Sequence, residues 1–172
     1  MSARELTSNP RIVAGVDGSP SSVSALRWAI RQAGLSGSSV DAVIAWHQPA
    51  AAAGFGWAPA DVDQDFSFEE LAGKTLTEAI SDTHDPAGDV GVRALVMEGN
   101  PAQVLLAAAA SADLLVVGSR GHGGFAEALL GSVSQHCVHQ ATCPVVVIRG
   151  DTALTGNGGS NRTAPVTAPP GA

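Results

Sequence analysis

Five short runs of apolar residues, most of them rich in valine and isoleucine, recur along the chain. Runs of β-branched residues at this length indicate β-strands. Longer segments lie between them, in which apolar residues recur every three or four positions, as in a helix. This alternation predicts an α/β fold: an open parallel sheet with right-handed crossovers and helices on both faces. The predicted strands cover 11–17, 40–46, 91–97, 113–118 and 144–149.

The predicted helices begin at residues that can cap a first turn. Ser67 is followed by Glu70 at the spacing of a capping box, and Ser132 is followed by Gln135 in the same way. Gly34 is the predicted end of the first helix. The four predicted caps are Ser19, Ser67, Asn100 and Ser132. The predicted buried stripe of the second helix is Leu71, Leu76, Ala79 and Ile80.

The apolar pattern is confined to residues 10–149, which we take as one domain preceded by a flexible segment, 1–9. Within it, residues 47–65 are rich in alanine, glycine and proline and predict a long loop. Residues 150–172 are poor in large apolar side chains, which predicts a disordered tail.

Composition narrows the class of protein. Apolar residues make up 45% of the 172 residues, but only 4% are aromatic, so the core is expected to be aliphatic. The net charge of −7 is concentrated between residues 61 and 89, and the lack of a basic face argues against nucleic acid as a partner. There is no apolar run of bilayer length and no signal-peptide pattern. We therefore expect a cytoplasmic protein without membrane contact, in which Cys137 and Cys143 are free thiols.

Glycines cluster directly after the fourth predicted strand. Gly118, Gly121 and Gly131 are followed by Ser132 at a predicted helix start. Glycine lets main-chain amides approach an anion, and a helix start offers unpaired N–H groups. Because ligands of open α/β sheets bind at the carboxyl ends of strands, these four residues together predict a phosphate site. The alternatives are glycines that only form turns and a Ser132 hydroxyl that caps its helix.

Other polar residues lie at the same predicted edge. Asp17, after the first strand, could bond ribose hydroxyls, approach Mg²⁺, or only form the turn with Gly18. Arg120 and His122 lie within the glycine loop, where a cation could meet phosphate or simply be exposed.

Several other kinds of site are not supported. The Walker pattern GxxxxGK[ST] is absent, and Lys74 is the only lysine. His136, His139 and Cys143 have helical spacing but no fourth zinc ligand. No paired carboxylates or activated nucleophile stand near the glycines. We therefore assign no catalytic residue and no metal ligand, and expect no dedicated enzyme activity.

The spacing Gly118-x2-Gly121-x9-Gly131-Ser132 resembles the G-2x-G-9x-G-[ST] signature of the ATP-binding branch of the universal stress protein family. "VDGSPSS" and "CPVVVIR" also resemble that family, and the likeness covers roughly residues 10–149. The resemblance implies an adenine nucleotide alpha hydrolase-like fold with strand order 3-2-1-4-5. It also implies ATP, with or without Mg²⁺, at the carboxyl edge of the sheet, and a homodimer.

The resemblance also implies roles for single residues. Asp17 would meet the ribose, and Trp46, at the end of the second strand, would border the adenine. For Trp46, stacking on the base and packing in the core remain alternatives. Val117 and Gly118 would lie by the adenosine, and Gly121, Gly131, Ser132 and Val133 would face the phosphates.

Three functions remain open. The first is a dimeric ATP-binding sensor or regulator of a stress response that acts on an unknown protein partner. The second is a slow Mg²⁺-dependent ATPase or nucleotidyl-transfer enzyme that uses Asp17. The third is a dimeric interaction module of the same fold without a nucleotide. The last strand, residues 145–149, is an expected apolar edge strand, which invites pairing with a second copy.

Overall fold

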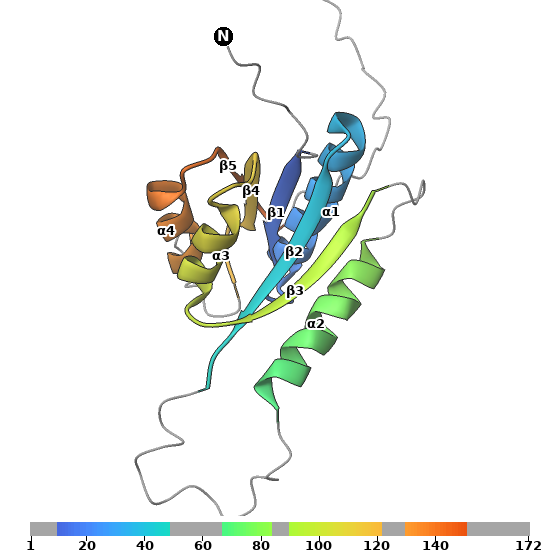
Figure 1. Cartoon of the computed structure of the whole chain (residues 1–172). Coiled ribbons are helices and arrows are strands. Elements are labelled where there is room, and N and C mark those ends of the chain that lie inside the picture. The colour runs from blue at the N-terminus through green and yellow to red at the C-terminus, as the bar shows by residue number, and fades with distance from the viewer. Residues whose placement is uncertain (1–9, 49–66, 84–89, 122–129, 151–172) are drawn as a thin grey trace, which may run out of the picture.

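A parallel sheet forms the centre of the molecule in the computed structural model, which describes residues 10–48, 67–83, 90–121 and 130–150 (Figure 1). Its strands are β1 (Arg11–Gly15), β2 (Ser39–Trp46), β3 (Val92–Glu98), β4 (Leu114–Gly118) and β5 (Val145–Ile148). The helices are α1 (Pro20–Ser36), α2 (Phe68–Asp82), α3 (Pro101–Ala109) and α4 (Ser132–Gln140). The strand order is β3-β2-β1-β4-β5 with parallel neighbours, so the predicted fold is confirmed. The expectations for 1–9, 49–65 and 151–172 lie outside the described residues.

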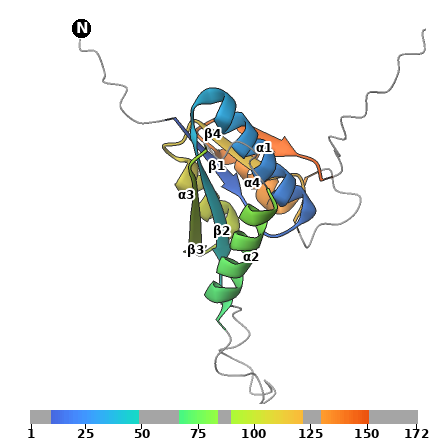
Figure 2. The same cartoon turned by 90° about the vertical axis from the view of Figure 1, so that its right-hand side faces the viewer.

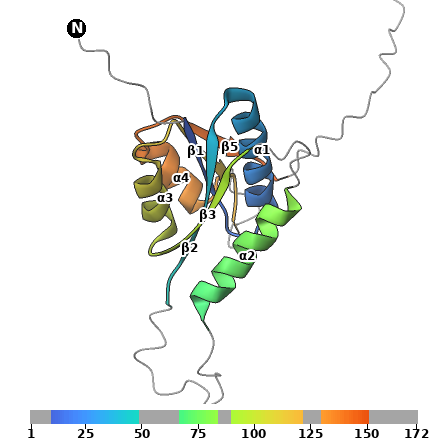
Figure 3. The same cartoon turned by 45° about the vertical axis from the view of Figure 1, so that its right-hand side comes forward.

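The helices cover both faces of the sheet. α1 and α2 pack on one face, and α3 and α4 on the other, with the strands between them (Figures 2 and 3). Each face has its own aliphatic core: Leu26 of α1 and Leu76 of α2 belong to the first, and Leu105 of α3 and Cys137 of α4 to the second. Successive strand residues alternate between the two cores, because side chains of a strand point to opposite faces in turn.

Three of the four predicted caps are confirmed. Side-chain oxygens of Ser19, Ser67 and Asn100 each accept a hydrogen bond from a main-chain N–H in the first turns of α1, α2 and α3. Each bond satisfies a donor that the helix itself leaves unpaired. The starts of these helices are therefore determined by local sequence.

Two details of the helices differ from the prediction. Gly34 lies within α1, and the helix ends instead at Gly37, whose φ of 68° is left-handed. Glycine adopts this helix-ending conformation without strain. Leu71 is 49% exposed rather than buried. It lies about 100° round the helix from Ala72, which is one of the residues that α2 buries.

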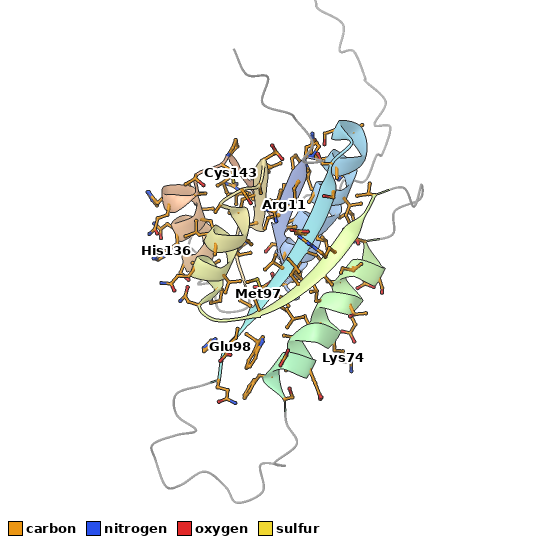
Figure 4. The ribbon with its side chains drawn as sticks, in the orientation of Figure 1. Arg11, Lys74, Met97, Glu98, His136 and Cys143 are labelled. Carbon is orange, nitrogen blue, oxygen red and sulfur yellow. The ribbon has the colours of Figure 1, made fainter. Side chains whose placement is uncertain are left out.

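A charged cluster joins three strands at their amino ends, on the α3 side of the sheet. Asp41 of β2 has only 3% of its side chain exposed. It accepts hydrogen bonds of 2.7 and 2.9 Å from Arg93 of β3 and one of 2.6 Å from Arg11 of β1. Arg11 (Figure 4) also donates to the Ala108 carbonyl and the Ser111 hydroxyl at the end of α3. We call Arg11, Asp41 and Arg93 the Asp41 cluster.

The ionisation of Asp41 follows from these contacts. Burial by itself would raise the pKa of the Asp41 carboxyl. The hydrogen bonds and positive charges of Arg93 and Arg11 outweigh burial and hold the pKa below its ordinary value. The cluster therefore joins β1, β2, β3 and α3 as a paired ionic group.

Candidate functional site

A cavity of about 440 Å³ opens at the carboxyl ends of β1, β2 and β4. At this edge β1 leads to a helix on one face of the sheet and β4 to a helix on the other, so the chain leaves a crevice between them. The wall is completed by the loop after β4 and by the first turns of α3 and α4. This is the edge at which the sequence predicted a ligand.

The floor of the cavity is apolar. Val43 and Ala45 of β2, Val117 of β4 and Leu105 of α3 line it. Gly15 at the end of β1 permits the close approach of α3, because a Cβ there would stand 2.9 Å from Leu105 Cδ1. The result is an apolar slot suited to a flat ring.

Asp17 lines the cavity and also shapes the turn that leads into α1. Its Oδ1 accepts hydrogen bonds from the main-chain N–H of Ser19 at 2.9 Å and from the Ser19 hydroxyl at 2.6 Å. The turn-forming role proposed as an alternative is thus present. It does not remove the carboxylate from the cavity, so both interpretations of Asp17 are compatible with the geometry.

The glycine at 118 makes room for a helix. A Cβ on Gly118 would lie 2.8 Å from the Ser21 main-chain carbon and 2.9 Å from the Ser22 nitrogen. Both neighbours are backbone atoms in the first turn of α1 and cannot yield without moving the helix. The structural need for glycine at 118 is therefore close packing of β4 on α1, although the residue also borders the cavity.

The glycine at 121 has a different neighbour. A Cβ there would lie 2.5 Å from Asp17 Oδ2. The loop after β4 thus crosses directly over the Asp17 carboxylate. A side chain at 121 would displace either the loop or Asp17, so this glycine sets the shape of the cavity rim.

Gly131, which was predicted to face the phosphates, does not have a free main-chain amide. Its main-chain N–H donates to the Ser119 carbonyl at 2.7 Å, so this amide is already bonded within the chain. Gly131 is the N-cap residue of α4, with φ −72° and ψ 162°, a conformation open to any residue. The predicted capping role of Ser132 is therefore wrong, because the helix begins one residue earlier than the capping box requires.

The first turn of α4 supplies the donors that Gly131 does not. Ser132, Val133 and Ser134 line the cavity, and no side chain caps the helix. Their N–H groups precede the first helical bond, from Gln135 N–H to the Gly131 carbonyl at 2.9 Å. Such amides are unpaired within a helix and carry its partial positive charge. Ser132 is exposed, which leaves its hydroxyl open to the cavity, whereas the Ser134 hydroxyl bonds the Gly118 carbonyl at 2.5 Å.

Trp46 lies outside the cavity, contrary to the expectation that it borders a base. Its side chain packs against the core formed by α1 and α2. Ala45, one position earlier, points to the opposite face and lines the cavity. Core packing, the alternative considered for Trp46, is therefore what the structure shows.

Ala45 also brings main-chain groups to the cavity. Odd-numbered residues of β2 direct their N–H and C=O toward β1, as the 2.8 Å bond from Val16 N–H to the Val43 carbonyl shows. The β1–β2 ladder ends with Gly15 opposite Val43. The main-chain groups of Ala45 on that side therefore face the cavity. Sequence reasoning missed Ala45, although its spacing of two from Val43 was a usable signal.

Arg120 is the cationic residue among the described residues that line the cavity. It lines the cavity from the loop after β4, and its carbonyl accepts a hydrogen bond from the Ser21 hydroxyl at the start of α1. The other loop cation considered, His122, lies outside the described residues.

Cys137 is buried in the core that α3 and α4 form with the sheet, and Cys143, labelled in Figure 4, is partly buried against the same core. Burial raises the pKa of the Cys137 thiol to about 11, and burial also raises that of Cys143. His136, one of the residues considered for zinc, turns its Nδ1 back to within 2.8 Å of the Ser132 carbonyl. Over the described ranges, no group of three or more His, Cys, Asp or Glu could hold a metal ion.

A family model for the universal stress protein family matches residues 9–149. The chain belongs to the universal stress protein family. Over 140 residues it is 37% identical to universal stress protein Rv1996 of Mycobacterium tuberculosis, a match that covers 80% of this chain and 43% of that protein. It is also 43% identical over 82 residues to a universal stress protein of Thermus aquaticus, which covers 46% of this chain and 57% of that one. The chain thus spans less than half the length of its mycobacterial relative.

Solved structures of this family have the same architecture. A universal stress protein in complex with cAMP aligns with a TM-score of 0.61 at 26% identity, over 84% of this chain and 99% of that chain. Universal stress protein UspA from Lactobacillus plantarum aligns with a TM-score of 0.57 at 18% identity, over 83% of this chain and 100% of that chain. The part of this family member that the structure describes has no helix long and apolar enough to cross a membrane.

Proposed function

We propose that this universal stress protein binds ATP in the cavity at the carboxyl edge of its sheet and acts as a dimeric, nucleotide-dependent regulator in the cytoplasm. The observation that carries the proposal is the pairing of an apolar slot with an uncapped helix start in one cavity. An adenine ring is flat and weakly polar, whereas phosphates are anions that helix N-termini attract. The cavity thus supplies both environments that a nucleotide needs.

Different residues would contact the adenine, the ribose and the phosphates. The adenine would lie in the slot formed by Val43, Ala45 and Leu105, with its polar edge against the main-chain N–H and C=O of Ala45. Asp17 would accept hydrogen bonds from the ribose hydroxyls. The phosphates would bind the amides of Ser132 to Ser134 and the Ser132 hydroxyl, with Val117, Gly118 and Gly121 enclosing the ligand between these ends.

Two further points support this division. The family member crystallised with cAMP shares 26% identity with this chain, which favours an adenine nucleotide here. The donor set also fits Mg²⁺ bound to phosphates. Asp17 is the carboxylate among the described lining residues, and Mg²⁺ on a nucleotide is held by one or two carboxylates together with phosphate oxygens and water. Bound Mg²⁺ would neutralise part of the phosphate charge.

Dimerisation is proposed on the edge strand. β5 ends the sheet, and its residues from Val145 to Ile148 are all partly exposed. An apolar edge of this kind is a surface on which a second copy can pair. Ser119, in the loop that borders the cavity, donates its N–H to the Ile148 carbonyl at 2.6 Å. The edge strand is therefore bonded directly to that loop.

The test is calorimetric titration of ATP into wild type and two glycine variants. In Gly131→Asp, the new side chain has room, since its Cβ would lie 3.5 Å from the nearest atom, but it places a carboxylate beside the phosphates. We expect ATP affinity to fall at least about tenfold, or 1.4 kcal/mol. Gly91→Asp is the matched control, because a Cβ there meets nothing within 4 Å at the opposite end of the sheet.

Three outcomes would contradict parts of the proposal. Equal ATP affinity in both variants would show that the phosphates do not bind at the start of α4. No binding by wild type would favour the interaction module without nucleotide. Release of phosphate from ATP, lost in Asp17→Ala while binding persists, would favour the enzyme.

A further inference from the structure

A positively charged residue of the loop after β4, Arg120, lies at the rim of the cavity. Arg120 lines the cavity, and its Cα lies 3.5 Å from the place that a Cβ on Gly131 would occupy. Since Gly131 caps α4, Arg120 stands directly beside the start of that helix. Arg120 and the helix amides thus border the same cavity.

The main chain at Arg120 is held in place from two sides. Its carbonyl accepts hydrogen bonds from the hydroxyls of Ser21 and Ser19, the latter at 3.4 Å. The preceding residue, Ser119, is 2% exposed and accepts the Gly131 N–H. These bonds fix where the Arg120 side chain leaves the loop.

The guanidinium itself makes no hydrogen bond or ion pair with any residue that the structure describes, whereas Arg11 and Arg93, at the opposite end of the sheet, are bonded to Asp41. A planar guanidinium offers paired donors that match phosphate oxygens. A ligand can therefore supply the partner that the described residues do not.

The effect of the Arg120 charge on an anionic ligand depends on the other charges that line the cavity. Asp17 and Arg120 are the charged residues among the described lining residues, so their formal charges cancel. The attraction for an anion then depends on where each charge lies. Asp17 Oδ1 is bonded to Ser19 at the end of β1 and its Oδ2 lies beside Gly121, whereas Arg120 lies beside the start of α4, where the amides add partial positive charge.

We propose that Arg120 makes the affinity of this site rise with the negative charge of the phosphate chain. This inference rests on the proposed nucleotide site and names its ligand class: open-chain adenine nucleotides, with ATP above AMP, and both above the singly charged cyclic nucleotide and adenosine. The helix amides would bind any phosphate group, and Arg120 would add affinity for the nucleotides that carry more negative charge.

The test is a ligand series titrated into wild type, Arg120→Gln and Arg31→Gln at two salt concentrations. Arg31 is the matched control, since it loses the same charge from an exposed position on α1, outside the cavity. In Arg120→Gln we expect ATP to bind about fivefold more weakly and adenosine less than about twofold, the size of a partly exposed charged hydrogen bond. Arg120→Lys should restore most of the grading, and wild-type ATP binding should weaken with salt more than that of Arg120→Gln.

The outcomes separate this inference from the proposed function. An equal loss for adenosine and ATP in Arg120→Gln would assign Arg120 a structural role and overturn the inference while the nucleotide site stands. A similar loss in Arg31→Gln would attribute the effect to overall charge, with the same consequence. If wild type binds no adenine compound at all, the proposed function fails and the inference fails with it.

Discussion

The two ends of the sheet handle their polar groups in opposite ways. At the amino ends, the Asp41 cluster pairs buried charge completely, with Arg93 and Arg11 on either side of one carboxylate. At the carboxyl ends, α4 begins without a side-chain cap and the Arg120 guanidinium has no partner among the described residues. The first arrangement stabilises the fold, and the second is the one at which we propose that a ligand binds. If the two ends are independent, a change at one end should leave the properties of the other unchanged.

The largest loss of stability is expected at the amino ends of the strands, where the Asp41 cluster lies. Asp41→Ala leaves Arg11, which is 24% exposed, without its carboxylate, and removal of one partner from a buried ionic group costs about 3 kcal/mol. Urea unfolding should show this loss, whereas Asp82→Ala, on the exposed side of α2, should change stability by less than about 0.5 kcal/mol. ATP affinity of folded Asp41→Ala should stay within twofold of wild type. A large fall in affinity would show that the two ends are coupled.

Gly118→Ala should be the next most damaging change, because the added Cβ would meet the backbone of Ser21 at 2.8 Å. Forcing α1 away from β4 should cost about 2 kcal/mol of unfolding free energy. Gly91→Ala is the control, with nothing within 4 Å of its Cβ. If both alanine variants unfolded at the same urea concentration, the packing explanation for Gly118 would be wrong.

The third prediction contrasts adjacent residues of β2. Ala45→Leu fills the cavity floor and should weaken ATP binding at least about tenfold, or 1.4 kcal/mol. Trp46→Leu removes packing from the opposite face and should lower stability while the ATP affinity stays within twofold. Calorimetry on both variants decides between the two residues. Weaker ATP binding in Trp46→Leu, with unchanged binding in Ala45→Leu, would show that Trp46 rather than Ala45 borders the ligand.

The smallest effect concerns pH. The pKa of Asp41 is below its ordinary value in the folded protein, so the native state holds the carboxylate charged where the unfolded chain would protonate it. The stabilisation is thus complete above the unfolded pKa, about 3.9, and is lost as pH falls through the lower folded value. Urea unfolding from pH 7 to pH 3 should show a steeper fall for wild type than for Asp41→Asn. Parallel curves would mean that Asp41 contributes nothing to this slope.

The fold was largely predictable because its signals are local and repeated. Apolar runs marked the strands, and Ser19, Ser67 and Asn100 marked three helix starts through bonds to residues two or three positions away. The strand order was implied by family resemblance rather than by periodicity, since no local signal says which strands are neighbours.

The site was predicted at the right edge but not in its details. Glycines reveal that a side chain is absent, not which neighbour requires the space: for Gly118 it is Ser21, and for Gly121 it is Asp17. The bond between Gly131 and Ser119 spans residues far apart in the chain, so spacing alone could not show that this amide is occupied. Trp46 was misplaced by one position, which in a strand changes the face.

The most direct measurement is amide NMR of the ¹⁵N-labelled protein with increasing ATP. If the first turn of α4 holds the phosphates, the amide signals of Ser132, Val133 and Ser134 should move most, and that of Gly131, already bonded to Ser119, should move less. Saturable shifts in the same amides with ADP, and none with adenosine, would match the charge requirement. Unchanged signals throughout 132–134 at saturating ATP would contradict the account.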